Sequence, residues 1–147
     1  MTPKQRRDPV GRDWCRTPML WQPGEGAGFA KPGVEPWLPL GDAARTSVAQ
    51  QTDDPGSVLH LARDLIRLRR LTDLGTAPYR TISVDGGLWV WERGSRLTVA
   101  ANLSDEHAHL KNADHDVLIG TNRERDGERV GGTVRVAPWE AVVLARP

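Results

Sequence analysis

Acidic side chains in the first third of the chain are the first candidates for chemistry, because two facing carboxyl groups can act as acid and base in hydrolysis. The candidates are Asp13, Glu25, Glu35 and Asp42. Their spacing does not force any two of them into a facing pair, and charged side chains in loops are mostly solvated. We therefore expect this chain to supply no catalytic residue.

Imidazole and carboxylate groups gather between residues 107 and 116. They are His107, His109, Asp114, His115 and Asp116. His107 and His109 would share a face if the segment is extended, and imidazole is a good ligand for Zn²⁺ or Ni²⁺. The spacing matches no established metal motif, and residues 104–116 resemble an exposed loop. We therefore expect no metal ion and no cofactor.

Tryptophan is unusually frequent, with six residues against one tyrosine and one phenylalanine. Trp89 and Trp91 alternate on a predicted strand, so their rings share one face. Two coplanar exposed rings would form a platform for sugars. Because residues 88–91 are all apolar, we favour burial of both rings in the core. Trp37 and Trp139 are likewise expected to pack inside the protein.

The single cysteine, Cys15, excludes an internal disulfide and fits a reducing compartment. No histidine partner is evident near it, so a packed or idle thiol is favoured over a nucleophile. The basic start of the chain is not followed by an apolar stretch. We therefore expect a cytoplasmic protein without a secretory signal.

The net charge of the chain is close to zero. The 147 residues include 20 basic and 19 acidic side chains, for a net charge of +1, and 38% are hydrophobic. Nothing in this balance indicates a nucleic-acid or membrane partner. No apolar run approaches the ~20 residues needed to span a bilayer. The length suits one domain, or a small domain with an irregular arm.

The elements that would position these side chains differ along the chain. Proline and glycine recur throughout residues 1–56, which predicts mostly irregular structure with a short helical turn near residues 46–51. Such a long irregular segment is uncommon in a free-standing domain. It would make sense if the segment lies across another domain.

Residues 54–71 are predicted to form an amphipathic helix. Asp54 is expected to cap the helix, with Pro55 at its first position, and Gly75 follows its end. The apolar face comprises Val58, Leu61, Ala62, Leu65 and Leu68, widened by Leu59 and Ile66.

Residues 79–147 are predicted to be β structure. The expected strands are 79–84, 88–92, 96–102, 116–120, 133–136 and 140–144. Asp85-Gly86-Gly87 is a signal for a tight hairpin, and Gly94-Ser95 marks another turn. Short runs of β-branched residues between frequent turns indicate an antiparallel sandwich.

A motif near the start of the chain reads Arg12-Asp13-Trp14-Cys15-Arg16-Thr17-Pro18-Met19-Leu20-Trp21. It resembles the Gly-Arg-Asp-x-x-Arg-Thr-Pro-Met-x-Trp segment of the α-glucosidases of glycoside hydrolase family 13, the α-amylase superfamily. Later segments resemble the family in the same order: Gly26-Ala27-Gly28-Phe29, Pro36-Trp37-Leu38-Pro39, Val48-Ala49-Gln50-Gln51, Asp54-Pro55-Gly56-Ser57-Val58-Leu59, Leu68-Arg69-Arg70, Ala101-Asn102-Leu103-Ser104 and Pro138-Trp139-Glu140-Ala141-Val142-Val143-Leu144. Ordered matches over nearly the whole chain are far more specific than one short motif.

The resemblance implies a mainly β fold. In the family, the Arg-Thr-Pro-Met segment follows the last strand of a (β/α)₈ barrel, the helix is the last barrel helix, and the tail is a β-sandwich. Residues 1–75 would then be the end of the catalytic barrel, with its last loop and one leftover amphipathic helix. Residues 76–147 would be the antiparallel β-sandwich C-terminal domain of the α-amylase family.

The same resemblance implies that the chain is non-catalytic by itself. A complete barrel needs about 250 residues. The family's nucleophilic Asp, general-acid Glu and stabilising Asp lie on earlier strands and have no counterpart here. The chain resembles the C-terminal part of an α-glucosidase, oligo-1,6-glucosidase or trehalose synthase, and no activity is expected for it alone.

Two residues of the motif are candidates for substrate binding. The resemblance places Arg16 near the substrate entrance, where a guanidinium can donate to sugar hydroxyls or hold an active-site acid, but it could equally pin its own loop. Trp21, with Met19, could line a sugar subsite, although burial against the barrel is favoured for both. Trp14 and Leu20 depart from the family pattern.

The favoured function is therefore the C-terminal, non-catalytic part of an enzyme acting on α-glucosides in carbohydrate metabolism. Its partners would be a family 13 barrel and, through that barrel, an α-glucan or oligosaccharide. An alternative is a stand-alone α-glucan-binding β-sandwich module that uses Trp89 or Trp91. A small metal-dependent protein built on the histidines is a third hypothesis.

Overall fold

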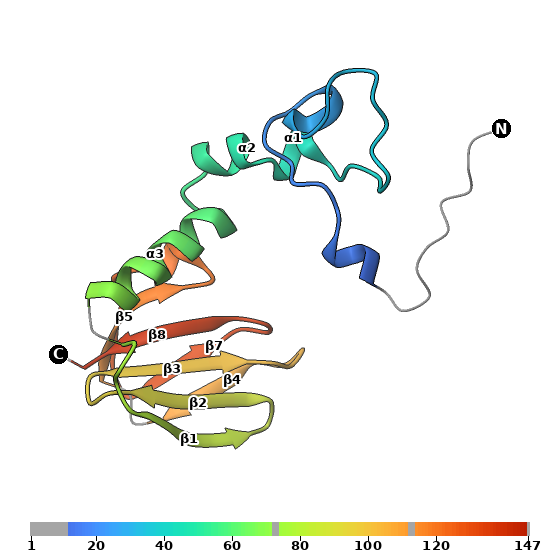
Figure 1. Ribbon diagram of the computed structural model, residues 1–147. Helices are drawn as coiled ribbons and strands as arrows, with labels where there is room; N and C mark the ends of the chain where they lie inside the picture. Colours follow the sequence, from blue (N-terminus) through green and yellow to red (C-terminus); the bar gives the residue numbers. More distant parts are fainter. Residues whose placement is uncertain (1–11, 72–73, 112–113, 147) are drawn as a thin grey trace. The chain divides into compact units, whose positions relative to one another are not determined.

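The computed structural model describes residues 12–71, 74–111 and 114–146 (Figure 1). The chain divides into two compact units at the junction between His60 and Leu61. In the described part of the chain, no helix combines the length and the apolar character that crossing a bilayer requires.

The first unit is mostly irregular chain with short helical turns, as predicted. Its elements are the 3₁₀ turns η1 (Arg12–Cys15) and η2 (Glu25–Gly28) and the helices α1 (Ala43–Thr46) and α2 (Val48–Asp53). Ser47 lies between the two helices, and its hydroxyl accepts a hydrogen bond from the Gln50 N–H at 3.4 Å. This side-chain cap satisfies a helix N–H that has no backbone partner.

Helix α3 (Val58–Leu71) begins four residues later than predicted. The Asp54 carboxylate accepts from the Gly56 N–H at 2.8 Å, which holds residues 54–56 in a turn instead of capping the helix. Ser57 takes the cap position, and its hydroxyl accepts from the His60 N–H at 3.4 Å. The expected roles of Asp54 as cap and Pro55 as first helical residue are therefore wrong.

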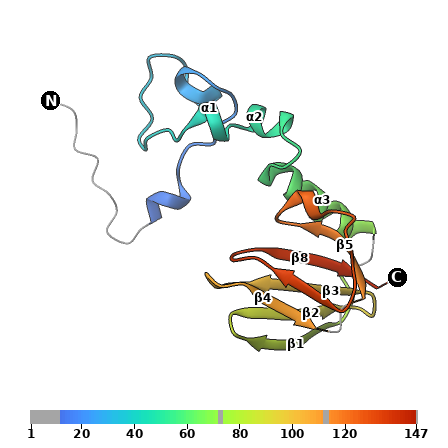
Figure 2. The same cartoon turned by 180° about the vertical axis from the view of Figure 1, so that it is seen from behind.

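The second unit is an antiparallel β-sandwich, so the expected fold class is confirmed (Figure 2). Its strands are β1 (Tyr79–Asp85), β2 (Leu88–Arg93), β3 (Leu97–Asn102), β4 (Ala108–Lys111), β5 (His115–Gly120), β6 (Arg129–Val130), β7 (Thr133–Val136) and β8 (Ala141–Ala145), with the 3₁₀ turn η3 (Arg123–Arg125) after β5. Six strands form one sheet in the order β1-β2-β3-β8-β5-β6, and β4 pairs with β7 as a separate ribbon.

The turn between β1 and β2 is the predicted tight hairpin. Asp85 pairs with Leu88, so only Gly86 and Gly87 form the loop. Both glycines have positive φ angles, 54° and 82°. This left-handed backbone matches the twist of the two strands and favours glycine, which explains why the Asp-Gly-Gly sequence marks the turn.

The core lies on the side of the large sheet that the β4–β7 ribbon covers. Alternation along the strands puts small and branched apolar side chains on this side. The buried cluster is Leu88, Val90, Ala100, Val117, Val130, Val134, Val136, Val142 and Leu144, with Ala108 and Leu110 packed against it. β4 was missed by sequence analysis, which expected a loop there, because only Ala108 and Leu110 carry its alternating pattern.

The opposite side of the sheet packs against α3. Leu61, Leu65 and Leu68 of the helix face Trp91, Val99 and Val143 of the sheet across an apolar cavity of about 280 Å³. None of the α3 residues is fully buried, and Val58 remains 73% exposed. The predicted apolar face of the helix is therefore only partly covered within the described residues.

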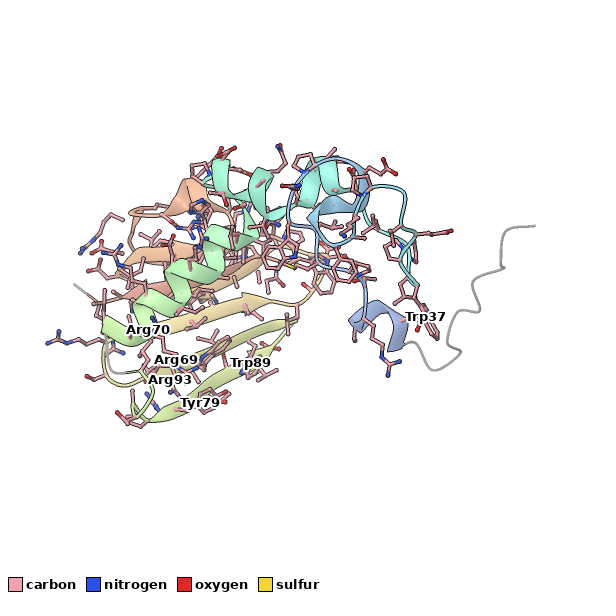
Figure 3. The ribbon with its side chains drawn as sticks, turned by 45° about the horizontal axis from the view of Figure 1, so that its top comes forward. Trp37, Arg69, Arg70, Tyr79, Trp89 and Arg93 are labelled. Atoms are coloured by element: carbon pink, nitrogen blue, oxygen red, sulfur yellow. The ribbon has the colours of Figure 1, made fainter. Side chains whose placement is uncertain are left out.

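The tryptophans are more exposed than the sequence indicates. Trp89 is 37% exposed and Trp91 is half-buried, because α3 covers only part of their face of the sheet. Figure 3 shows Trp89 and Tyr79 on the neighbouring strands β2 and β1. Trp37 and Trp139, also expected to pack inside, are 88% and 64% exposed in loops outside the core. The expectation of burial was wrong for Trp37, Trp89 and Trp139.

Candidate functional site

Arg16 lies in a hollow of about 330 Å³ in the first unit. The hollow is lined by Asp13, Arg16, Pro18, Phe29, Pro36, Trp37 and Leu38. Its residues come from the motif near the start of the chain and from the loop that contains Pro36 and Trp37. The structure thus places Arg16, a candidate for substrate binding, next to Trp37, which was expected to be a packing residue.

Two local turns position this hollow. The Arg16 N–H donates to the Asp13 carbonyl at 3.0 Å, which closes η1 immediately before Arg16. The loop beyond η2 is closed by the Glu25 carboxylate, which accepts from the Gly33 N–H at 2.7 Å. Glu25, considered above as an acid for catalysis, therefore has a structural role in shaping the loop.

The side chains around the hollow suit the recognition of a hydroxyl-rich molecule. Trp37 is 88% exposed and extends from its loop (Figure 3). Arg16 is exposed as well and presents a planar fork of N–H donors. An aromatic face combined with such donors can hold a sugar ring by stacking and by hydrogen bonds to its hydroxyls. The same guanidinium can pair with a carboxylate of another domain.

Trp21, the other candidate for substrate binding, does not line this hollow. Its backbone N–H donates to the Ala27 carbonyl at 2.9 Å, and its carbonyl accepts from the Ala49 N–H at 3.0 Å. These two bonds join η2 and α2 through residue 21. The indole is 52% exposed, so much of its surface is open for contact with another domain or a ligand.

The side chains of the histidine-rich segment, residues 107–116, take part in separate interactions. The His107 ring accepts from the Arg135 Nε–H at 3.2 Å, whereas Arg129 pairs with Asp114 and Asp116 at 3.3 and 3.0 Å. His115 is buried. Within residues 12–71, 74–111 and 114–146, no three His, Cys, Asp or Glu side chains are grouped so that they could hold a metal ion.

A second group of charged side chains, which was not predicted from the sequence, is centred on Arg125. Its Nε–H donates to Glu128 at 2.6 Å, and one of its terminal nitrogens donates to both oxygens of Glu140 at 3.1 and 3.2 Å. The hydrogen bond to Glu128 contributes most to raising the pKa of Arg125, and Glu140 adds to it against the opposing effect of burial. Glu128 is only three residues from Arg125, but Glu140 is 15 residues away, too far for a local pattern to reveal it.

The chain thus combines an irregular segment, an amphipathic helix and an antiparallel β-sandwich. Two family models match it. Residues 2–75 match the model described as the catalytic domain of α-amylase, and residues 77–143 match a domain of unknown function, DUF3459. The chain belongs to the α-amylase family, glycoside hydrolase family 13, and corresponds to the C-terminal part of its oligo-1,6-glucosidase-like members.

Individual relatives agree with this assignment. The chain is 31% identical over 141 residues to an oligo-1,6-glucosidase of Heyndrickxia coagulans, covering 90% of this chain and 24% of that protein. It is 38% identical over 101 residues to the trehalose-6-phosphate hydrolase of Escherichia coli strain K12, covering 65% of this chain and 18% of that protein.

The fold also has counterparts among solved structures. The trehalulose synthase MutB from Pseudomonas mesoacidophila MX-45 matches with a TM-score of 0.77 and 25% identity, over 91% of this chain and 26% of that chain. The chain therefore spans about a quarter of the length of such relatives.

Proposed function

We propose that this chain is the C-terminal, non-catalytic part of an α-glucosidase-like glycoside hydrolase that acts on α-glucosides. The observation that carries the proposal is the match of residues 2–75 to the catalytic-domain model, with the sandwich following directly. A (β/α)₈ barrel needs about 250 residues, and these 74 supply only its end. Hydrolysis then depends on carboxyl groups of the remaining barrel, and the chain has no glycosidase activity alone.

The proposed partner of α3 is the remainder of a family 13 barrel. The helix lies inside the segment that matches the catalytic domain. Its exposed apolar side chains include Val58, Ile66 and Leu71, at 73%, 51% and 73%. A helix that packs on a sheet with one side and leaves apolar residues on another is suited to a position between two layers. Residues 1–75 and 76–147 would then belong to the barrel and to the sandwich domain.

Arg16 is the residue that we propose to contact the substrate in the assembled enzyme. It shares its hollow with the exposed Trp37, and active sites of (β/α)₈ barrels are built from the loops after their strands. In this arrangement Arg16 donates to sugar hydroxyls or holds a catalytic carboxylate in place. Trp21 remains a second proposed contact, on the strength of its exposed indole.

A two-part experiment tests the proposal. The purified chain is first incubated with p-nitrophenyl α-glucoside and isomaltose, and no glucose release above the buffer background is expected. A chimera is then made in which the chain replaces the matching quarter of the Heyndrickxia coagulans oligo-1,6-glucosidase, and this chimera is expected to hydrolyse both compounds. Glucose release by the purified chain alone would overturn the proposal, as would an inactive chimera that is folded.

The role of Arg16 is tested in the same chimera. Arg16→Ala is expected to raise KM or lower kcat by about tenfold or more, the loss typical of one charged hydrogen bond to a substrate. Arg45→Ala, in the exposed helix α1, serves as the matched control and should leave both constants unchanged. Equal effects of the two substitutions would contradict a specific contact between Arg16 and the substrate.

A further inference from the structure

Trp139 occupies an unusual position in the turn before β8. Its side chain is 64% exposed, and its indole Nε1–H donates to the Asp105 carboxylate at 2.8 Å. Because this bond fixes the edge of the indole, the ring is oriented while much of its surface stays in solvent. An exposed large aromatic side chain that is held in place differs from the scattered apolar residues of an ordinary protein surface.

The backbone of this turn is held in a conformation that tryptophan rarely adopts. Trp139 has a φ of 57°, a left-handed conformation that costs an L-residue with a Cβ about 1–2 kcal/mol. The buried Glu140 carboxylate maintains it by accepting from the Ala137 N–H at 2.7 Å, while Arg125 donates to the same carboxylate. Strain that is kept by a specific network points to a functional use of the residue in question.

A wide hollow of about 670 Å³ adjoins this indole. The polar side chains of Asn122, Arg135 and Thr121 line it beside Trp139. They come from the segment after β5 and from β7, so the hollow is built from different parts of the sandwich. Planar amide and guanidinium groups beside an aromatic face provide hydrogen bonds and stacking together, as a sugar ring requires.

The charges in the hollow balance. Arg125 and Arg135 are matched by Glu128 and Glu140, and Arg125 is already bonded to both glutamates. The Nε–H of Arg135 also donates to the Nδ1 atom of His107 at 3.2 Å. A hollow without net charge does not favour a phosphate or a nucleic acid over a neutral molecule. A neutral, hydroxyl-rich ligand fits it best.

We propose that this hollow is a saccharide-binding site, in which an α-glucan oligosaccharide stacks on Trp139 and is hydrogen-bonded by Arg135 and Asn122. The choice of α-linked glucose rests on the function proposed above, whereas the site itself does not involve Arg16 or the barrel. It lies on the sandwich at the start of β8, and neither Trp89 nor Trp91 lines it. The indoles of that pair are inclined at 43° and cannot form one flat platform.

The test uses the whole 147-residue chain labelled with ¹⁵N, whose six tryptophans each contribute one indole N–H signal. The signal missing from Trp139→Asn identifies Trp139, because asparagine tolerates the left-handed backbone better than other residues with a Cβ. Titration with maltoheptaose is expected to shift this signal saturably, with a Kd of about 1 mM or below. Trp139→Asn is expected to weaken binding at least about tenfold, as for a central aromatic contact.

Trp89→Phe is the matched control, since Trp89 is also an exposed tryptophan of the sandwich. It should bind maltoheptaose like the unmodified chain, and circular dichroism should show both variants folded. The absence of any shift of the Trp139 signal would overturn the proposal, as would equal binding by Trp139→Asn. Tighter binding of a thymidine oligonucleotide than of maltoheptaose would overturn the argument for a neutral ligand. Because these readouts need no barrel, they fail or succeed separately from the glycosidase chimera.

Discussion

The Arg125 guanidinium donates to both carboxylate oxygens of Glu140, at 3.1 and 3.2 Å, across 15 residues of sequence. The Glu140 side chain is only 7% exposed and that of Arg125 only 17%. Glu140 also accepts from the Ala137 N–H, so this ion pair fixes the turn that carries Trp139 into β8. A charge pair that is both buried and bonded to the backbone is strongly coupled to the fold.

Replacing Glu140 by Gln should therefore destabilise the sandwich. The substitution keeps an acceptor for Ala137 but leaves the partly buried Arg125 with one fewer counter-charge. We expect the free energy of unfolding to fall by about 2–3 kcal/mol, below the full cost of breaking a completely buried pair. Urea denaturation followed by circular dichroism measures this change.

The matched control is Arg129→Gln, which removes an ion pair with Asp114 and Asp116 at the surface. Exposed pairs contribute about 0–1 kcal/mol, so this variant should unfold close to the unmodified chain. An equal loss of stability in the two variants would contradict the structural role assigned to Glu140.

His115 should make the stability of the sandwich depend on pH. Burial, followed by the positive charge of Arg146, lowers the pKa of His115 below its ordinary value of 6.5. The unfolded chain therefore takes up a proton before the folded chain does. The free energy of unfolding should fall as the pH decreases below about 6.5 towards the lower pKa of the folded state. Denaturation curves between pH 8 and 5 measure this dependence.

His115→Leu should remove this pH dependence, because the leucine fills the buried position without a titrating group. In the described part of the chain neither ring nitrogen of His115 has a hydrogen-bond partner, so no bond is lost. His109→Gln is the control, since His109 is exposed on β4. An unchanged pH profile in His115→Leu would show that other groups dominate the acid sensitivity.

The two glycines of the β1–β2 hairpin should respond differently to alanine. A Cβ at Gly87 would lie 2.6 Å from the Cβ of Ser104, whereas a Cβ at Gly86 would meet no atom within 4 Å. Both have a positive φ, so each substitution carries a backbone cost of about 1–2 kcal/mol. We expect Gly87→Ala to be less stable than Gly86→Ala by at least about 1 kcal/mol, because of the additional clash. Thermal unfolding of the two variants measures the difference, and equal stabilities would contradict the close approach of Ser104.

The two faces of the large sheet should differ in their sensitivity to cavity formation. Leu144 is fully buried in the core, whereas Leu65 of α3 is 39% exposed at the edge of an apolar cavity. Leu144→Ala should reduce the free energy of unfolding by about 3–5 kcal/mol, and Leu65→Ala by about 1 kcal/mol, because solvent already reaches part of Leu65. A cost for Leu65→Ala as large as that for Leu144→Ala, measured in urea, would show that α3 is more tightly packed than this structure indicates.

Most strands were predictable because their signals are local. The loop formed by Gly86 and Gly87 follows from the left-handed backbone that a two-residue hairpin needs. The apolar alternation of β2 and β3 likewise requires only neighbouring residues. The start of α3 was predicted wrongly because Asp54 and Ser57 both suit a helix cap, and only the hydrogen bond from Gly56 to Asp54 decides between them.

The family assignment also came from sequence, because it depends on the identity and order of residues such as those of the Arg12–Trp21 motif. The composition of the first unit, rich in glycine and proline, determined that its chain is irregular. Which residues meet in the two hollows depends on the tertiary structure alone. Arg16 lies beside Trp37, and Arg125 pairs with Glu140, because loops distant in sequence fold back on one another. The exposure of Trp37 and Trp139 likewise depends on which surfaces the chain covers. The type of an apolar residue does not determine whether a neighbour will bury it.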